Sequence, residues 1–157
     1  MTRYAQNTTV SITKSLAEIE RIVERFGASD FAYMTSKTGQ SAVVFEINNR
    51  RVRFIISTPS ETAQEFTQTS KGRARTASVR RELWEQARRQ RWRALALVVK
   101  AKLEAIESGI TEFEDEFMAH IVLPSGQTVG DFMKPQITQA YLEGTLPSML
   151  PELTSAE

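Results

Sequence analysis

Residues 41–58, SAVVFEINNRRVRFIIST, hold the pattern that decides the fold. Apolar side chains occupy every second position in two runs, Val43, Phe45, Ile47 and then Val52, Phe54, Ile56. A period of two is typical of strands that bury one face and expose the other. Asn48 and Asn49 separate the runs, and asparagine tolerates the backbone of a tight hairpin turn. The stretch therefore predicts a β-hairpin whose outward positions include Arg51 and Arg53.

A third strand precedes this hairpin. Residues 31–36, FAYMTS, are rich in β-forming side chains, and the turn-forming residues 37–40, KTGQ, follow them. We therefore expect strands at 31–36, 41–48 and 50–58 to form a three-stranded antiparallel meander. One face of this sheet is then available to cover the helix that precedes it.

The N-terminal region predicts an amphipathic helix. Residues 8–12 are β-prone, and Ser15 follows them with Glu18 three residues later, which is the spacing of a capping box. Apolar residues then recur at steps of three and four, at Leu16, Ile19, Ile22, Val23 and Phe26. Gly27 ends the pattern, so we expect a helix over 15–26 with one buried stripe.

The middle of the chain predicts a loop and a long helix. Residues 59–78 are polar apart from Phe66, so we expect a long loop or mobile arm there. A helix should follow over 78–107, ending before Gly109. Its apolar side is expected to comprise Leu83, Ala87, Ala94, Val98, Ala101 and Ala105. The basic first half should project from the core, whereas residues 94–99 are apolar all round and should be enclosed.

The C-terminal third predicts two further helices. A short acidic helix is expected at 113–117, an extended segment at 120–123 and a turn at 124–126. Thr128 should cap a helix over about 129–143 that ends at Gly144. We expect this helix to be anchored through Phe132, Ile137 and Tyr141, and residues 152–157 to be disordered.

These elements predict a single domain over residues 1–157 of the α+β class. An N-terminal helix packs on the three-stranded antiparallel meander, and a long central helix and a C-terminal helical segment follow. Strands precede helices instead of alternating with them, and the chain shows no internal repeat.

Composition excludes most catalytic and metal chemistry. The chain has no cysteine, and its one histidine, His120, cannot form a two-histidine metal site within one chain. The motifs of nucleotide-binding loops, nucleophile elbows and zinc proteases are absent. We therefore predict that the protein is not an enzyme and has no cofactor, metal ligand or catalytic residue. His120 is interpreted as a packing residue.

No membrane segment is expected. The longest purely apolar run, residues 94–99, is far shorter than the roughly 20 residues of a membrane helix. The N-terminus lacks the pattern of a secretory signal, so the sequence predicts a cytoplasmic location.

Basic charge is concentrated in one segment. Residues 71–93 hold nine Lys and Arg against two Glu and carry +7, while the rest of the chain carries −6. Because arginine forms bidentate contacts with phosphate, we expect nucleic acid to contact Arg73, Arg75, Arg81, Arg88, Arg89 and Arg93. At about 100° per residue, the last four should share the solvent side of the helix, opposite Leu83 and Ala87. At least one of Trp84 and Trp92 is expected in the core.

Other interpretations of the charges remain open. The arginines could instead pair with acidic residues that follow Leu103, within the chain or across a dimer: Glu104, Glu107, Glu112, Glu114, Asp115 and Glu116. Antiparallel pairing of two long helices would bring these charges together, so we predict a homodimer. A weaker alternative is a Mg²⁺-dependent nuclease that uses Glu114, Asp115 or Glu116. A solvated helix start explains these carboxylates more simply.

Three segments carry a resemblance. They are TVSITKS (9–15) running into AEIER (17–21), then RWRALALVVKAKLE (91–104), then HIVLPSGQTVG (120–130). Together they resemble a group of small proteins of tailed phages and prophages, a group with no established activity. The resemblance implies a role in nucleic-acid metabolism or binding to a host protein such as a defence enzyme, in the cytoplasm of the host cell.

The sequence thus predicts a non-enzymatic, phage-type accessory protein. Its Arg-rich helix would bind the backbone of DNA or RNA with little base specificity. The alternative is a protein-interaction module or inhibitor that binds a host defence protein through the same basic segment.

Overall fold

The computed structural model describes residues 5, 7–36 and 40–144. The sheet consists of β1 (Asp30–Thr35), β2 (Gln40–Ile47) and β3 (Arg50–Ser57), in the order β1-β2-β3 with antiparallel neighbours. Asn48 and Asn49 form the β2-β3 turn with φ of 52° and 58°, the left-handed backbone that tight hairpins need. The predicted meander is confirmed.

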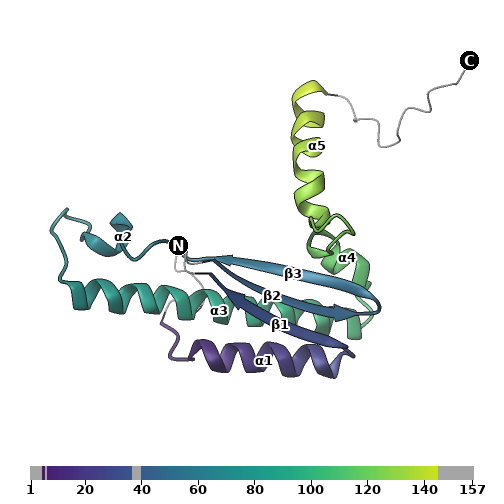
Figure 1. Cartoon of the computed structure of the whole chain (residues 1–157), viewed down its shortest axis with the longest axis horizontal. Coiled ribbons are helices and arrows are strands. Elements are labelled where there is room, and N and C mark those ends of the chain that lie inside the picture. Colours follow the sequence, from purple (N-terminus) through teal and green to yellow (C-terminus); the bar gives the residue numbers. More distant parts are fainter. Residues whose placement is uncertain (1–4, 6, 37–39, 145–157) are drawn as a thin grey trace, which may run out of the picture.

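Two helices lie along one face of this sheet (Figure 1). They are α1 (Ile12–Arg25) and α3 (Ala77–Glu107), which also pack against each other. The alternating residues of β2 and β3 point into the core between the layers, where Val43, Phe45 and Val52 are fully buried. The core draws further residues from α1, α3 and α4 (Phe113–Phe117), so one hydrophobic cluster joins the elements from α1 to α4. This is the α+β arrangement that the sequence predicts.

Helix α1 begins one turn earlier than predicted. Ser11 is the N-cap, because its hydroxyl accepts a hydrogen bond from the Lys14 amide at 3.2 Å. Ser15 lies inside the helix and is fully buried. The earlier start brings Ile12 against the core, which a start at residue 15 would not do. The β-prone residues 8–12 therefore form no strand.

The buried side of α3 differs from the predicted one. The residues that enter the core are Trp92, Leu95, Ala96, Val99 and Leu103, at steps of three and four. The predicted apolar side faces outwards, since Leu83 is 37% exposed and Val98 is 44% exposed. The large side chains of Trp92 and Leu103 gain more from burial than the alanines that dominate the opposite side. Residues 94–99 are consequently enclosed on one side only.

Residues 59–76 form an ordered arm and not an open loop. It contains the short helix α2 (Gln64–Thr67), and a bridge between Gln68 and Ala74 closes a turn. Phe66 is 5% exposed, as expected of the segment's apolar anchor. The arm packs against the first half of α3, beyond the end of the sheet (Figure 1).

The C-terminal part follows the predicted elements but not the predicted packing. The short helix η1 (Met118–His120) leads through a turn at 124–126 to α5 (Val129–Glu143), and the Thr128 hydroxyl caps α5 by accepting from the Asp131 amide at 3.1 Å. Helix α5 extends away from the sheet (Figure 1) and has no buried residue. Its predicted anchors are exposed, Phe132 by 49%, Ile137 by 50% and Tyr141 by 87%. Residues 152–157, predicted to be disordered, lie outside the described residues. Among those described, no helix has the length and apolar character to cross a bilayer.

Candidate nucleic-acid interface

Residues 61–91, which we call the basic arm, form the end of the molecule opposite α4. They include α2, the turn at 68–74 and the first half of α3, which holds no buried residue before Trp92. Eight Lys and Arg stand against four Glu in this segment, a net charge of +4. The surface is therefore positive and lies beyond the sheet.

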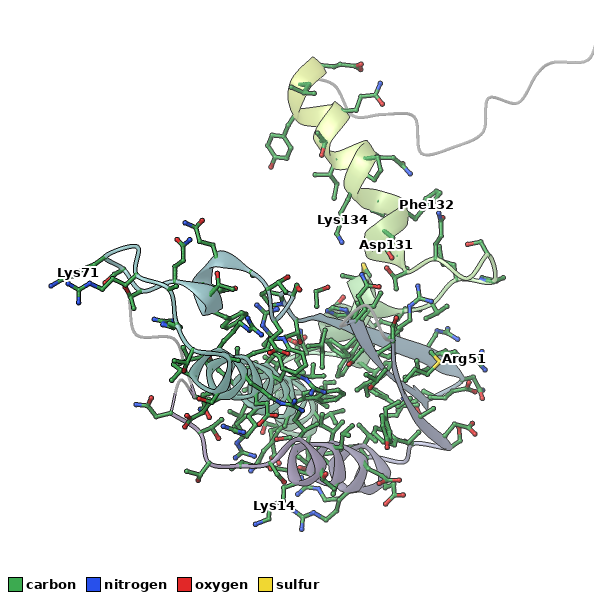
Figure 2. All side chains as sticks on the ribbon, turned by 60° about the vertical axis from the view of Figure 1, so that its left-hand side comes forward. Lys14, Arg51, Lys71, Asp131, Phe132 and Lys134 are labelled. Atoms are coloured by element: carbon green, nitrogen blue, oxygen red, sulfur yellow. The ribbon has the colours of Figure 1, made fainter. Side chains whose placement is uncertain are left out.

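The turn at the tip of the basic arm exposes two cations. The Thr69 amide donates to the Arg73 carbonyl at 2.8 Å, and the Arg73 amide donates to the Thr69 hydroxyl at 3.1 Å, which holds the turn in shape. Gly72 adopts a φ of 74°, a left-handed conformation that favours glycine. Lys71 points away from the body (Figure 2). Within the described residues, the structure records no ion pair for Lys71 or Arg73.

Two arginines connect α2 and α3. The Arg75 guanidinium donates to the Glu65 carbonyl at 2.9 Å, and Arg80 lies 3.4 Å from the Glu61 carboxylate. Both contacts hold residues 59–76 against the first half of α3. Arg75, predicted to bind nucleic acid, therefore has a structural contact that uses one of its nitrogens and leaves the others available.

Arg81, Arg88 and Arg89 line the first half of α3. Arg81 pairs with Glu85 one turn away at 3.3 Å, and its side chain is 71% exposed. Arg88 stacks over the Trp84 ring at 4.8 Å from the ring centroid. Arg89 donates twice to the Gln86 side-chain oxygen, at 2.6 and 3.0 Å. Each contact is local, so the three cations stay on one stretch of surface.

Arg81 and Arg88 lie opposite Leu83 as predicted, and the Arg81 side chain is 71% exposed, but this side of α3 does not face solvent along its whole length. Arg81 and Arg88 precede Val99 by five and by about three turns, so they lie on the same side of α3 as the buried stripe. They remain accessible because the sheet and α1 end before this part of the helix (Figure 1). Residues 59–76 cover this part of α3 only partly.

Arg93 is separate from the basic arm. It forms an ion pair with Glu18 of α1, and the two side chains are only 24% and 22% exposed. This pair joins the two helices of the core layer. Arg93, predicted to contact nucleic acid, therefore has a structural role at a place where a phosphate would have to displace Glu18.

The acidic residues after Leu103 have other partners. Arg25 of α1 binds Glu104 at 3.0 Å and Glu107 at 2.9 Å, and Lys102 binds Glu116 at 2.9 Å. Within the described chain these carboxylates do not neutralise the basic arm. The alternative in which the helix arginines pair with them inside one chain is thus not observed. The homodimer remains a prediction.

The carboxylates around Glu114 do not form a metal centre in the described part of the chain. No group of three or more Asp, Glu, His or Cys residues there is placed to hold a metal ion. Glu116 is bound to Lys102, and Glu114 lies 3.8 Å from Arg50. The nuclease alternative gains no support from this geometry.

His120 packs against the sheet. Its ring stacks on Phe54 with centroids 4.0 Å apart. Burial, assisted by the charge of Lys102, lowers the pKa of His120 below its usual 6.5. This environment fits the interpretation of His120 as a packing residue.

The sequence pattern did not indicate a hollow on the outer face of the sheet. Two adjoining cavities of about 540 and 550 Å³ lie between the strands and the turn at 124–126. Arg51 and Glu46, which form a salt bridge at 3.4 Å, line both of them. The outward direction predicted for Arg51 is confirmed, but the turn that completes the hollow begins 73 positions further along the chain, at Pro124, and no local pattern could reveal it.

Trp84 and Trp92 have different environments. Trp92 is 2% exposed and belongs to the core, as predicted for at least one of the two. The Trp84 indole donates to the Pro59 carbonyl at 2.9 Å while Arg88 lies over its ring. Trp92 is therefore closed to a base, and Arg88 occupies one face of the Trp84 ring.

Comparisons with family models, with curated proteins and with solved structures found no match.

Proposed function

We propose that this chain is a non-enzymatic accessory protein that binds the phosphate backbone of nucleic acid through the basic arm. The observation that carries the proposal is the exposed turn with Lys71 and Arg73 beside the half-exposed arginines of α3. Phosphate contacts from Lys and Arg supply most of the affinity of such proteins. The resemblance to phage proteins is compatible with this role.

The ion pairs within the arm do not oppose the proposal. The Arg81–Glu85 pair is mostly in solvent, and such surface pairs contribute only about 0 to 1 kcal/mol. A phosphate, which accepts bidentate hydrogen bonds from arginine, can replace the glutamate at little cost. Arg81 therefore belongs with Lys71 and Arg73 in the proposed contact set, whereas Arg93 does not.

Binding should show little sequence preference. Arg88 occupies one face of the Trp84 indole, and the contact residues reach from a turn and one helix face, without a helix inserted among base edges. The linear charge density of duplex DNA exceeds that of single strands, so we expect tighter binding to duplex at equal length.

The test is fluorescence anisotropy with labelled duplex and single-stranded DNA and RNA over about 50 to 200 mM salt, the range in which phosphate contacts are most visible. The variant is Lys71→Gln/Arg73→Gln. The matched control is Lys14→Gln/Arg21→Gln, which removes the same two charge types from exposed positions of α1. Figure 2 shows that Lys14 points into solvent far from Lys71.

We expect the arm variant to reduce the slope of log K against log salt by about 0.9 for each lost contact, or about 1.8 in total, on duplex DNA. The control should keep the wild-type slope. Equal reductions of the salt slope in both variants would mean that net charge and not the basic arm drives binding. Absence of binding by the wild-type chain at the lowest salt would refute the proposal.

A second candidate function is supported by α5. A single helix of 15 residues is marginal in water, and Pro135 removes one of its internal hydrogen bonds. Yet α5 has no buried residue and exposes Ile137, Tyr141 and Leu142, the last by 82%. These observations favour the protein-interaction alternative, with the apolar side of α5 seated in an apolar groove of another protein.

One pull-down experiment from host lysate distinguishes the two candidate functions. A protein partner of α5 should be retained by Lys71→Gln/Arg73→Gln and lost with Ile137→Asp/Leu142→Asp. A protein that binds the basic arm instead would show the reverse pattern, and nuclease treatment of the lysate would remove any partner bridged by nucleic acid.

A further inference from the structure

The outer edge of β1 is open. Within residues 5, 7–36 and 40–144, no strand or bridge pairs with β1 on the side away from β2. The strand sequence DFAYMT contains no Lys and no Pro, which are the residues that usually prevent an edge strand from pairing. The edge is therefore competent to accept another strand.

The register shows which backbone groups are available there. The Ser36 amide donates to the Gln40 carbonyl at 2.7 Å, so this pair is hydrogen-bonded. In an antiparallel ladder the residues that bond one neighbour alternate with those that point the other way. Phe31, Tyr33 and Thr35 consequently direct their amide and carbonyl groups towards the open edge.

Both faces of β1 expose a large apolar side chain. Tyr33 is opposite Val43 on the helix side of the sheet and is 57% exposed, while Met34 is opposite Ala42 on the outer side and is 61% exposed. A strand that is apolar on both faces is typical of the interior of a sheet. One additional strand beside β1 would cover both side chains at once.

We propose that β1 pairs antiparallel with β1 of a second copy of this chain, with the two-fold axis at Tyr33. This register pairs all three outward residues, because Phe31 meets the partner's Thr35, and Tyr33 meets its own counterpart. Each such pair exchanges two backbone hydrogen bonds. The two three-stranded sheets become one continuous six-stranded sheet.

The side chains of β1 favour self-pairing over an unrelated strand. In this register the small Ala32 lies opposite the partner's Met34, and the reciprocal pair fills the other half of the same surface. Asp30, the only charged residue of β1, lies opposite Ser36, so no like charges face each other. The net charge of +1 gives little repulsion between two copies.

Substitution of the edge tests the proposal. Tyr33→Lys places two lysines opposite each other in the dimer, whereas Ile55→Lys makes a similar change at an outward residue of β3 with the same 57% exposure. Sedimentation equilibrium measures the mass over a range of concentrations. We expect the wild-type chain and Ile55→Lys to reach twice the 17.7 kDa chain mass, and Tyr33→Lys to dimerise at least about tenfold more weakly.

A cysteine placed at the two-fold axis tests the register. The natural chain has no cysteine, so Tyr33→Cys introduces a single thiol. Cα atoms of a hydrogen-bonded antiparallel pair are about 5.5 Å apart, which a disulfide can span. Tyr33→Cys should form a covalent dimer under mild oxidation, and Ile55→Cys should not. A monomeric wild type, or a dimer that survives Tyr33→Lys and fails to cross-link through Tyr33→Cys, would overturn the proposal.

Discussion

Two leucines on α3 provide a direct test of which side of this helix is buried. Leu103 is 1% exposed within the core, whereas Leu83 is 37% exposed on the side that faces outwards. Replacing either with alanine makes the same chemical change in the same helix. The difference between the two losses of stability therefore reports packing alone.

The expected magnitudes follow from burial. Leu103→Ala removes buried carbon groups worth about 0.8 kcal/mol each and leaves a cavity, for a total of about 3 kcal/mol. Leu83 borders a surface hollow open to solvent, so its loss leaves no closed cavity and should cost about 1 kcal/mol or less. With a urea slope of about 2 kcal/mol per molar, the midpoints should fall by about 1.5 M and about 0.5 M.

Urea unfolding at one protein concentration, followed by tryptophan fluorescence, measures both midpoints. Trp92 is 2% exposed and changes its surroundings on unfolding, so it is a suitable probe. Equal losses for the two variants would refute the assignment of the buried side. So would a larger loss for Leu83→Ala.

Three further predictions concern single contacts. In a double-mutant cycle of Arg93→Gln and Glu18→Gln, the coupling should be about 1 to 3 kcal/mol in urea unfolding, while the salt slope of DNA binding should remain that of wild type. Burial lowers the pKa of His120, so the unfolded chain binds a proton there at higher pH than the folded chain. The stability that neutral His120 contributes is present above about pH 6.5 and is lost as the pH falls through the lowered pKa. Between about pH 7 and 5.5, the urea midpoint should therefore fall less steeply for His120→Gln than for the wild-type chain. In Gly130→Ala, the new Cβ would lie 2.7 Å from the Ala119 carbonyl oxygen. Thermal unfolding should show that the free energy of unfolding falls by about 1 to 3 kcal/mol. An unchanged unfolding temperature for Gly130→Ala would show that the backbone near Ala119 and Gly130 moves apart without loss of stability.

Local patterns were sufficient to predict the sheet. Alternation in β2 and β3 sets both the strand bounds and the buried face, and the Asn48-Asn49 turn fixes the register between them. The bounds of α3 were also predicted to within a residue, because the polar segment ends at residue 78 and Gly109 follows the last turn. These features depend on neighbours in the sequence.

Faces of helices were harder to predict than their bounds. Alanines surround α3 on several sides, so two stripes were compatible with the sequence, and the choice depends on which one meets the sheet. The apolar residues of α5 follow a helical pattern, but that pattern does not tell whether they pack against the core of their own chain. The capping-box spacing predicted Ser15 as the N-cap of α1, whereas Ser11 caps the helix and Ile12 packs against the core.

The sequence revealed the positive charge of the candidate interface, but not which of its residues form ion pairs with distant residues. The Arg81–Glu85 contact spans one helical turn and could be anticipated. Arg93 and Glu18 are 75 positions apart, so only the packing of α1 against α3 brings them together. That long-range contact removes Arg93 from the set that the sequence alone predicts.

The far edge of the sheet differs from the open one. The Val122 amide donates to the Arg51 carbonyl at 2.8 Å and Ile121 bridges Val52, so the first half of β3 is already occupied. A chain with one accepting edge and one obstructed edge can add a single neighbour and then stops, whereas two accepting edges would permit a fibre without end. In the proposed dimer, the segment 120–122 would therefore keep β3 from accepting a further strand. Shortening it should convert a closed pair into an open-ended, aggregating array.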